Sequence, residues 1–178
     1  MDLSDHDLMA RVAGGDQQAF RVLVRRHAAA AHRLARRIVG SDAMAEDIVQ
    51  DALLRVWINA ARWRPEAAFR TWFYRIIVNL CLNAKRRPAD LPLSAAGDPP
   101  GADDAPGAAL EQHERDRALG AAVEALTARQ RAAIVLSYQE GLSNVEAAAV
   151  LDASVSGLEA LLVRAKRTLR AVLGNDPG

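Results

Sequence analysis

The segment from Pro88 to Glu114 constrains the fold of this chain more than any other feature. It contains five of the seven prolines and three glycines, and it carries six acidic residues but no lysine or arginine. Proline removes a backbone donor and glycine resists ordering, so a continuous helix or strand is disfavoured here. We therefore expect an acidic, disordered linker over residues 88–114, between modules at 1–87 and 115–178.

The charge is divided along the same boundaries. Residues 1–87 have a net charge of +6, the linker a net charge of −6 and residues 115–178 a net charge of +1. This asymmetry indicates a basic module, an acidic tether and a second module. The hydrophobic fraction is 51% and aromatic residues make up only 4%, while alanine, leucine and arginine abound, which favours helices.

Composition also excludes several classes of protein. No apolar run approaches the roughly 20 residues of a membrane span, and the acidic N-terminus lacks a signal-peptide pattern, so we expect a cytoplasmic protein. The single cysteine, Cys81, excludes an internal disulfide, and its apolar neighbours predict that it is buried. The four histidines are scattered and no glycine-rich phosphate loop is present. We therefore expect no metal, no cofactor and no enzymatic activity.

Capping signals predict an all-α fold with a compact bundle before the linker. Ser4, Asp16 and Ser41 can each cap a helix, and Gly14 and Gly40 can end the first two. A fourth apolar stretch runs from about residue 68 to residue 84.

Shorter helices are predicted after the linker. The first is expected over about 110–125, and the next carries an apolar stripe at Ile134, Val135 and Tyr138. Capping boxes are predicted at Thr127 with Gln130 and at Ser143 with Glu146. A helix over 144–151, a turn at 152–154 and a helix to about 173 have the pattern of a helix-turn-helix.

Two clusters of side chains point to binding functions. Five of the eight aromatic residues fall between Trp63 and Tyr74, and arginines lie among them. Aromatic faces beside cations suit unpaired nucleic acid, although Trp72 and Phe73 also fit a helix core. The second cluster, at Glu46, Asp47, Gln50 and Asp51, is either a solvated acidic face or a docking surface for a basic partner.

These stretches resemble a known family. Residues 45–57 (AEDIVQDALLRVW) and 69–79 (FRTWFYRIIVN) are similar to conserved region 2 of extracytoplasmic-function (ECF) sigma factors. Residues 126–131 (LTARQR) and 141–151 (GLSNVEAAAVL) resemble region 4 of the same family. The resemblance implies a transcription initiation factor that binds core RNA polymerase and promoter DNA, and that an anti-sigma factor, often membrane-bound, holds inactive.

The resemblance also implies roles for individual residues. The clamp helices of the largest polymerase subunit would be bound by Asp47, Gln50 and Asp51. The −10 promoter element would be contacted by Trp63, Phe69, Arg70, Asn79, Asn83, Lys85, Arg86 and Arg87. In that set, Trp63 and Phe69 would hold a flipped base, and the last three residues would meet phosphates. The −35 element would be contacted by Ser156, Gly157, Glu159, Ala160, Val163, Arg164 and Arg167.

The expected recognition helix departs from the family pattern. The family often opens this helix with a Thr-Val-Lys-Ser-Arg-like run, whereas this chain has Gly157-Leu158-Glu159-Ala160-Leu161. Glu159 can accept a hydrogen bond from cytosine but repels phosphate. Two alternatives therefore stay open, namely a sigma-like decoy that sequesters an anti-sigma factor and a stand-alone helix-turn-helix regulator.

The linker length adds a mechanical expectation. Promoter elements about two helical turns apart are separated by roughly 70 Å. A segment of this length spans at most about 90 Å when extended and averages about 30 Å when relaxed. The free protein is therefore expected to sample compact arrangements and to bind promoter duplex poorly.

Overall fold

A computed structural model describes residues 3–86 and 117–174, and all regular secondary structure within these two ranges is helical. The predicted linker and Arg87 lie outside the described residues. So does the beginning of the helix expected over 110–125, of which residues 117–124 are described and helical. Within the described part, no helix is long and apolar enough to cross a membrane.

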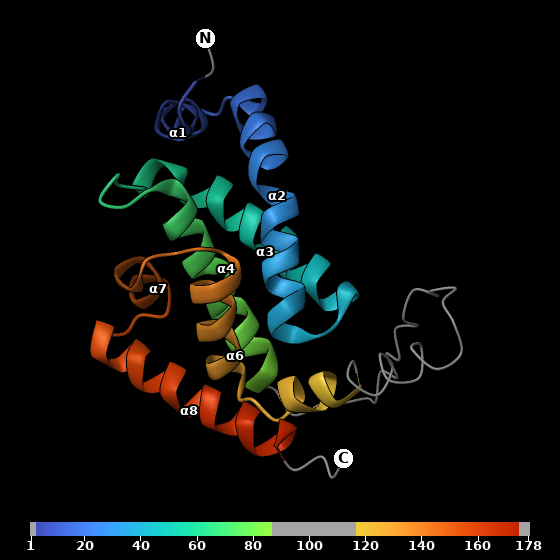
Figure 1. Ribbon diagram of the computed structural model, residues 1–178. Helices are drawn as coiled ribbons and strands as arrows, with labels where there is room; N and C mark the ends of the chain where they lie inside the picture. Colours follow the sequence, from blue (N-terminus) through green and yellow to red (C-terminus); the bar gives the residue numbers. More distant parts are fainter. Residues whose placement is uncertain (1–2, 87–116, 175–178) are drawn as a thin grey trace.

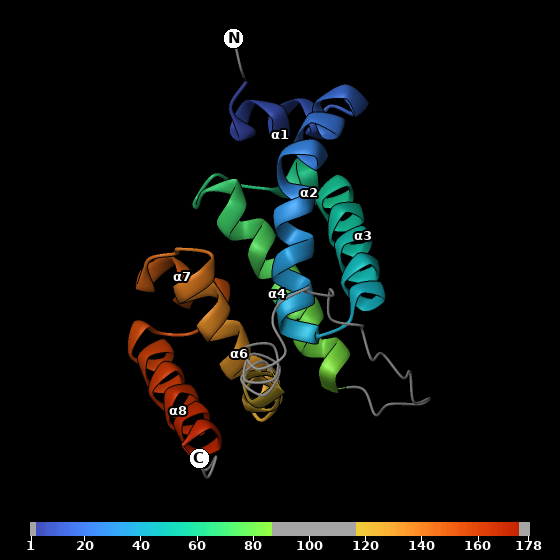
Figure 2. The same cartoon turned by 45° about the vertical axis from the view of Figure 1, so that its right-hand side comes forward.

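The N-terminal module is a bundle in which α2 lies at the centre (Figure 1). Its elements are α1 (Asp5–Ala13), α2 (Gln17–Val39), α3 (Asp42–Asn59), the short 3-10 turn η1 (Ala60–Arg62) and α4 (Phe69–Arg86). Helix α2 packs against α1, α3 and α4. Figure 2 shows α1 lying across one end of the bundle, at the N-terminal end of α2.

Side-chain caps determine where these helices begin, as predicted. The Ser4 hydroxyl accepts a hydrogen bond from the Asp7 amide, and the Asp16 carboxylate accepts from the amides of Gln18 and Ala19. These oxygens satisfy amides that have no partner within the helix. Gly40 ends α2 with a φ of 79°, a left-handed conformation that favours glycine.

The C-terminal module confirms the predicted helix-turn-helix. Its elements are α6 (Ala128–Ile134), the π-helical turn η2 (Val135–Gln139), α7 (Asn144–Val150) and α8 (Val155–Leu173). Both predicted capping boxes are present, at Thr127 with Gln130 and at Ser143 with Glu146. The turn between α7 and α8 includes Asp152, which has a φ of 52°.

The π-helical turn alters one predicted stripe. Val135 and Leu136 are buried, but Tyr138 is 57% exposed, although we expected it on the same apolar stripe as Val135. A π-helix turns through fewer degrees per residue than an α-helix, so the side chains that follow change face. The Tyr138 ring instead lies beside the ammonium group of Lys166, which is 4.9 Å from the ring centroid.

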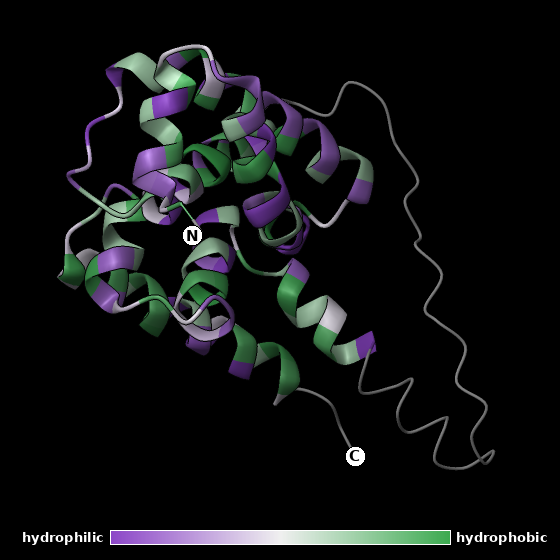
Figure 3. Ribbon diagram, turned by 90° about the horizontal axis from the view of Figure 1, so that it is seen from above, coloured by the Kyte–Doolittle hydropathy of each residue, from purple (hydrophilic) through white to green (hydrophobic). Residues whose placement is uncertain are grey.

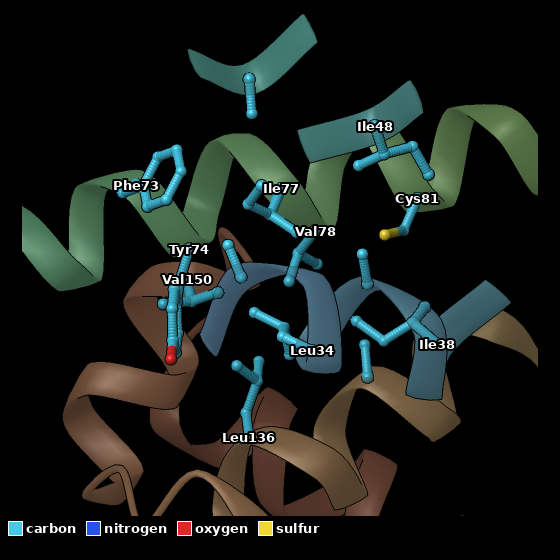
Figure 4. Packing of buried hydrophobic residues seen from close by; sticks show 14 of the residues in the cluster. Leu34, Ile38, Ile48, Phe73, Tyr74, Ile77, Val78, Cys81, Leu136 and Val150 are labelled. Atoms are coloured by element: carbon cyan, nitrogen blue, oxygen red, sulfur yellow. The ribbon is translucent and has the colours of Figure 1, made fainter. Parts of the chain in front are cut away.

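The two modules share one hydrophobic core. Helix α6 packs against α2 and α4, and α7 packs against α4. Figure 4 shows Leu136 pointing toward Leu34 of α2, and Val150 of α7 beside Tyr74 of α4. All four residues are buried in a single cluster. Hydrophilic and hydrophobic residues alternate along the helices, as expected of helices that bury one face (Figure 3). The described parts of the modules are therefore closed against each other.

A half-buried arginine also crosses the boundary between the modules. The Arg131 guanidinium donates to the carbonyl of Ile38, at 3.1 Å, and to that of Val123, at 2.8 Å. The Ile38 carbonyl lies in the last turn of α2. Carbonyls in the last turn of a helix have no hydrogen-bond partner within that helix. Burial lowers the pKa of Arg131. The cation therefore links α6 to the end of α2.

Candidate nucleic-acid interface

An aromatic pocket lies where the end of α3, the η1 loop and α4 meet. Its volume is about 530 Å³, and polar and apolar side chains both line it. The lining residues are Arg55, Asn59, Arg62, Trp63, Arg64, Glu66, Trp72, Ile76 and Asn79. The structure therefore brings together two predicted −10 residues, Trp63 and Asn79.

Trp63 is held at the wall of this pocket by other rings. Its ring centroid is 6.3 Å from that of Trp72 and 5.7 Å from that of His6. Its backbone amide donates to the carbonyls of Asn59 and Ala60, which fixes the residue directly after η1. The indole N–H is buried and has no acceptor among the described residues. Buried donors are nearly always paired, so this indole N–H is an exception among the described residues.

The pocket is rich in positive charge. Arg55, Arg62 and Arg64 line it, against the single carboxylate of Glu66. Arg62 and Arg64 are exposed on either side of Trp63. Aromatic faces flanked by guanidinium groups can stack a base and contact its phosphate.

Two predicted −10 residues lie elsewhere. Phe69, which we expected to hold a base, is only 5% exposed and stacks on Phe73 at 5.6 Å, with His27 4.9 Å away. This expectation needs correction, because Phe69 lies at the first turn of α4, where its ring enters the core. Arg70 lies outside the pocket lining, and it donates to the backbone carbonyl of Glu140 at 2.5 Å.

The other predicted −10 residues lie further along α4. Asn83, Lys85 and Arg86 are all exposed. Asn83 lines a second cavity, of about 510 Å³, together with Asp47 and Asp51 of α3. The expected polymerase and DNA contacts therefore adjoin each other between α3 and α4.

The acidic cluster of α3 forms part of an exposed face. Asp47 and Gln50 are exposed, and the half-buried Asp51 accepts two hydrogen bonds from Arg55, at 3.1 and 3.2 Å. Sequence reasoning missed two residues on this face. Leu54 is 56% exposed and Ile58 is 66% exposed, one and two turns beyond Gln50. Both residues lie off the stripe of α3 that is buried, so the helical spacing in the sequence could have shown that they are exposed apolar residues.

The predicted −35 residues follow one face of α8. The exposed ones are Ser156, Glu159, Ala160, Val163, Arg164 and Arg167. Gly157 is half-buried, and its amide donates to the capping hydroxyl of Ser154 at 3.0 Å. Helix α8 packs against α6 and α7 on its other side. Most of the predicted recognition face is therefore accessible in the closed arrangement.

Among residues 3–86 and 117–174, no group of three or more histidine, cysteine, aspartate or glutamate side chains could hold a metal ion.

An exposed helix-turn-helix face and a cationic aromatic pocket define a class of helical nucleic-acid-binding proteins. Comparison with known families is more specific. Residues 23–90 match the family model for Sigma-70 region 2, and residues 116–169 match that for Sigma-70, region 4. The chain is 35% identical to the ECF RNA polymerase sigma factor SigM of Mycobacterium tuberculosis, over 96% of this chain and 85% of that protein. The chain belongs to the ECF RNA polymerase sigma factors, which are alternative transcription initiation factors.

Solved structures have the same fold. CnrH, solved in complex with the cytosolic domain of CnrY, has a TM-score of 0.68 and 32% identity to this chain. The match covers 97% of this chain and 99% of CnrH. The sigma factor RpoE of Bartonella quintana, solved in complex with the anti-sigma factor NepR, has a TM-score of 0.65 at 22% identity. That match covers 89% of this chain and 98% of the other, and it supports the fold alone.

Proposed function

We propose that this chain directs core RNA polymerase to promoters and that the pocket beside Trp63 receives an unpaired base of the −10 element. The observation that carries the proposal is the pocket itself, because it combines an aromatic wall, the amide of Asn79 and three arginines. We assign −10 recognition and polymerase binding to residues 1–87, and −35 recognition to residues 115–178. The protein is then a specificity subunit rather than an enzyme, and it acts in the cytoplasm with polymerase.

Base capture follows from the chemistry of this pocket. A base leaving the duplex loses its stacking, and an aromatic wall restores part of it, about 1–3 kcal/mol per base. Asn79 offers both a donor and an acceptor to the base edge. Phe69 supports the pocket from within the core and does not contact the base.

The exposed face of α3 is the proposed site for core polymerase. Asp47, Gln50 and Asp51 present polar groups, and Leu54 continues the face with an apolar side chain. Interfaces commonly combine a few apolar anchors with charged groups that set the orientation. Arg55 pairs with Asp51 and holds its carboxylate in place.

The α8 face is the proposed −35 reader. Arg164 and Arg167 can contact phosphates or guanine, while Val163 and Ala160 offer apolar contact to thymine methyl groups. Glu159 opposes phosphate, so we expect modest affinity of α8 for DNA and a strong dependence on polymerase. If that affinity proved negligible, the sigma-like decoy would be favoured.

We also propose that an anti-sigma factor holds the protein inactive. The support is the relationship to CnrH, whose solved structure contains the cytosolic domain of CnrY. In the closed arrangement the two modules share one hydrophobic core, so such a partner would meet both modules together.

Binding measurements on the full chain test these assignments separately. Trp63→Ala is expected to lower the affinity of the polymerase complex for a single-stranded −10 oligonucleotide about tenfold or more, whereas Tyr138→Ala should leave it unchanged. Asp51→Arg is expected to lower affinity for core polymerase, while the same charge reversal at the exposed Glu124 should not. Equal oligonucleotide affinity for Trp63→Ala and the wild type would contradict the −10 assignment.

A further inference from the structure

We propose that Asp5, His6 and His27 are positioning residues of the aromatic pocket, because they fix helix α1 against the loop that carries its tryptophan wall. Asp5 and His27 form, together with Arg26, what we call the α1 clasp. The inference rests on the proposed function, since the position of this wall matters only if the pocket receives a base. The clasp residues and His6 all lie outside the pocket lining, so they would act through Trp63.

Helix α1 depends on the rest of the module for its position. It has nine residues, and helices shorter than about 12–15 residues are marginal in isolation. Leu8, Met9 and Val12 bury one face of α1 in the core. The helix also packs against η1, which directly precedes Trp63. A displacement of α1 would therefore move the surface against which the Trp63 loop rests.

The α1 clasp ties the first turn of α1 to the middle of α2. One carboxylate oxygen of Asp5 lies 2.7 Å from Nε2 of His27, and the other accepts a hydrogen bond from Arg26 at 2.9 Å. A carboxylate can only accept, so the imidazole donates from Nε2. Arg26 also donates to the carbonyl of Leu3 at 2.7 Å. Hydrogen bonds between charged partners are among the stronger ones, so the clasp fixes where α1 begins.

A series of ring contacts runs from the clasp to the pocket. The ring centroid of His27 is 4.9 Å from that of Phe69, which is 5.9 Å from that of Trp72. Trp72 in turn lies 6.3 Å from Trp63, and Trp63 lies 5.7 Å from His6. His6 directly follows the clasp carboxylate in the chain. The contacts therefore form a closed circuit that begins and ends at adjacent residues of α1.

The Trp63 ring has little support from its own loop. Residues 64–68 are all exposed, and the hydrogen bonds of the Trp63 amide fix its backbone rather than its ring. Among the described residues, the two rings beside it are those of Trp72 and His6. Stacking on a base requires a wall in a defined place, and a small displacement of a binding group costs affinity. His6 therefore supports the wall from α1, while Trp72 supports it from α4.

A second cluster of similar composition provides a control. Asp42 begins α3 as Asp5 begins α1, so both carboxylates complement the dipole of their helix. One oxygen of Asp42 lies 3.5 Å from His32 and 3.4 Å from Arg36, both on α2. Asp42 is the more exposed of the two carboxylates, and its cluster lies outside the lining of the pocket. Removing Asp42 therefore breaks a similar contact in the same module without a link to Trp63.

Binding of a labelled single-stranded oligonucleotide by the full chain with core polymerase tests the proposal. The oligonucleotide carries the −10 element of the promoter upstream of the gene's own operon. Asp5→Ala and His6→Ala are each expected to lower affinity about fivefold, since a displaced wall loses part of its stacking on the base. His6→Phe keeps a ring beside Trp63 and should restore the affinity. Asp42→Ala should leave it at the wild-type value.

A double-mutant cycle separates positioning from a general loss of stability. If Asp5 acts through Trp63, adding Asp5→Ala to Trp63→Ala should cause no further loss of affinity for the oligonucleotide. An equal loss from Asp5→Ala in both backgrounds would overturn the proposal. Wild-type affinity of both Asp5→Ala and His6→Ala would overturn it as well.

Fluorine NMR of the full chain labelled with fluorotryptophan reports on the rings directly. Trp57 lies 5.2 Å from Phe20 and outside the series of ring contacts, so it serves as the internal reference. Asp5→Ala should shift or broaden the Trp63 resonance and leave that of Trp57 in place, whereas Asp42→Ala should change neither. Equal changes at both tryptophans in Asp5→Ala would show general loosening and would contradict a positioning role.

The result for Trp63→Ala separates this inference from the proposed function. If Trp63→Ala binds the oligonucleotide as well as the wild type does, base capture fails and the positioning role fails with it. If Trp63→Ala loses affinity while Asp5→Ala and His6→Ala do not, base capture stands and only the positioning role is overturned.

Discussion

The thiol of Cys81 is buried among the apolar residues of α4 and α2, and burial raises its pKa to about 12. A thiol reacts as the thiolate, so Cys81 should be inert near neutral pH in the folded chain. We expect an aromatic disulfide reagent to label it only at the rate of unfolding, and at once in denaturant. Rapid stoichiometric labelling of the native protein would show that the core opens there.

Tyr74 predicts a dependence of stability on alkaline pH. Burial, together with the neighbouring carboxylate of Glu140, raises its pKa from 10.0 to about 12. Because the raised pKa favours the neutral phenol, its contribution to stability is complete below pH 10 and is lost as the pH rises through 12. Absorbance titrations of wild type and Tyr74→Phe should differ by one tyrosinate step near pH 12. If the extra tyrosinate step of the wild type instead appeared near pH 10, the buried contact of Tyr74 with Glu140 would be contradicted.

At the scale of elements, the left-handed cap at Gly40 predicts a matched pair of substitutions. Gly40→Ala should lower the free energy of unfolding by about 1–2 kcal/mol, because an alanine side chain clashes in that conformation. Gly120→Ala should raise it by about 0.5–1 kcal/mol, since Gly120 is helical with open space around it. Thermal melts should show shifts of about 2–4 °C per kcal/mol, in opposite directions. Shifts of the same sign would refute the assigned backbone conformations.

Because Leu54 is exposed, we expect its replacement to weaken binding to core polymerase without lowering the stability of the fold. Leu54→Asn should change the free energy of unfolding by no more than about 0.5 kcal/mol, because the side chain is largely in solvent. It should weaken binding to core polymerase by about 1–2 kcal/mol if Leu54 is an anchor of the α3 face. Leu119→Asn, at a similarly exposed leucine, serves as the control. Equal affinity of the two variants for core would remove Leu54 from the interface.

The elements were largely predictable from the sequence because their signals are local. Ser4, Asp16 and Ser41 cap the predicted helices, and the capping boxes at Thr127 and Ser143 are where they were expected. The π-helical turn was not predictable, because no local residue pattern marks it; in the structure the turn packs against α2, α6 and α7. Tyr138 is exposed because of this turn.

The candidate site was predictable only in part. Trp63 follows the end of a helix, and its position outside the regular pattern marked it as a surface residue. Phe69 carries no such mark, since a residue that starts a helix can point into the core or out of it. The direction of the Phe69 ring is set by His27 and Phe73, which are distant or buried neighbours.

At the scale of the whole molecule, the sequence indicated two modules but not their contact. The contacts of Glu140 with Arg37 and Tyr74 join residues far apart in the chain, and no local pattern encodes them. The contact of Leu34 with Leu136 in the shared core also joins residues far apart in the chain, and no local pattern encodes it. If α8 and the Trp63 pocket have the proposed roles, a chain closed in this way has to open before they reach two promoter elements roughly 70 Å apart.

Run-off transcription from the promoter upstream of the gene's own operon, with core polymerase, tests the central claim most directly. The account predicts transcripts with the wild type and with Glu124→Arg, and none with Asp51→Arg, which should fail at polymerase binding. Trp63→Ala should bind polymerase but fail to melt the promoter. Full activity of Trp63→Ala, or a wild type that binds core polymerase yet starts no transcript, would contradict the account.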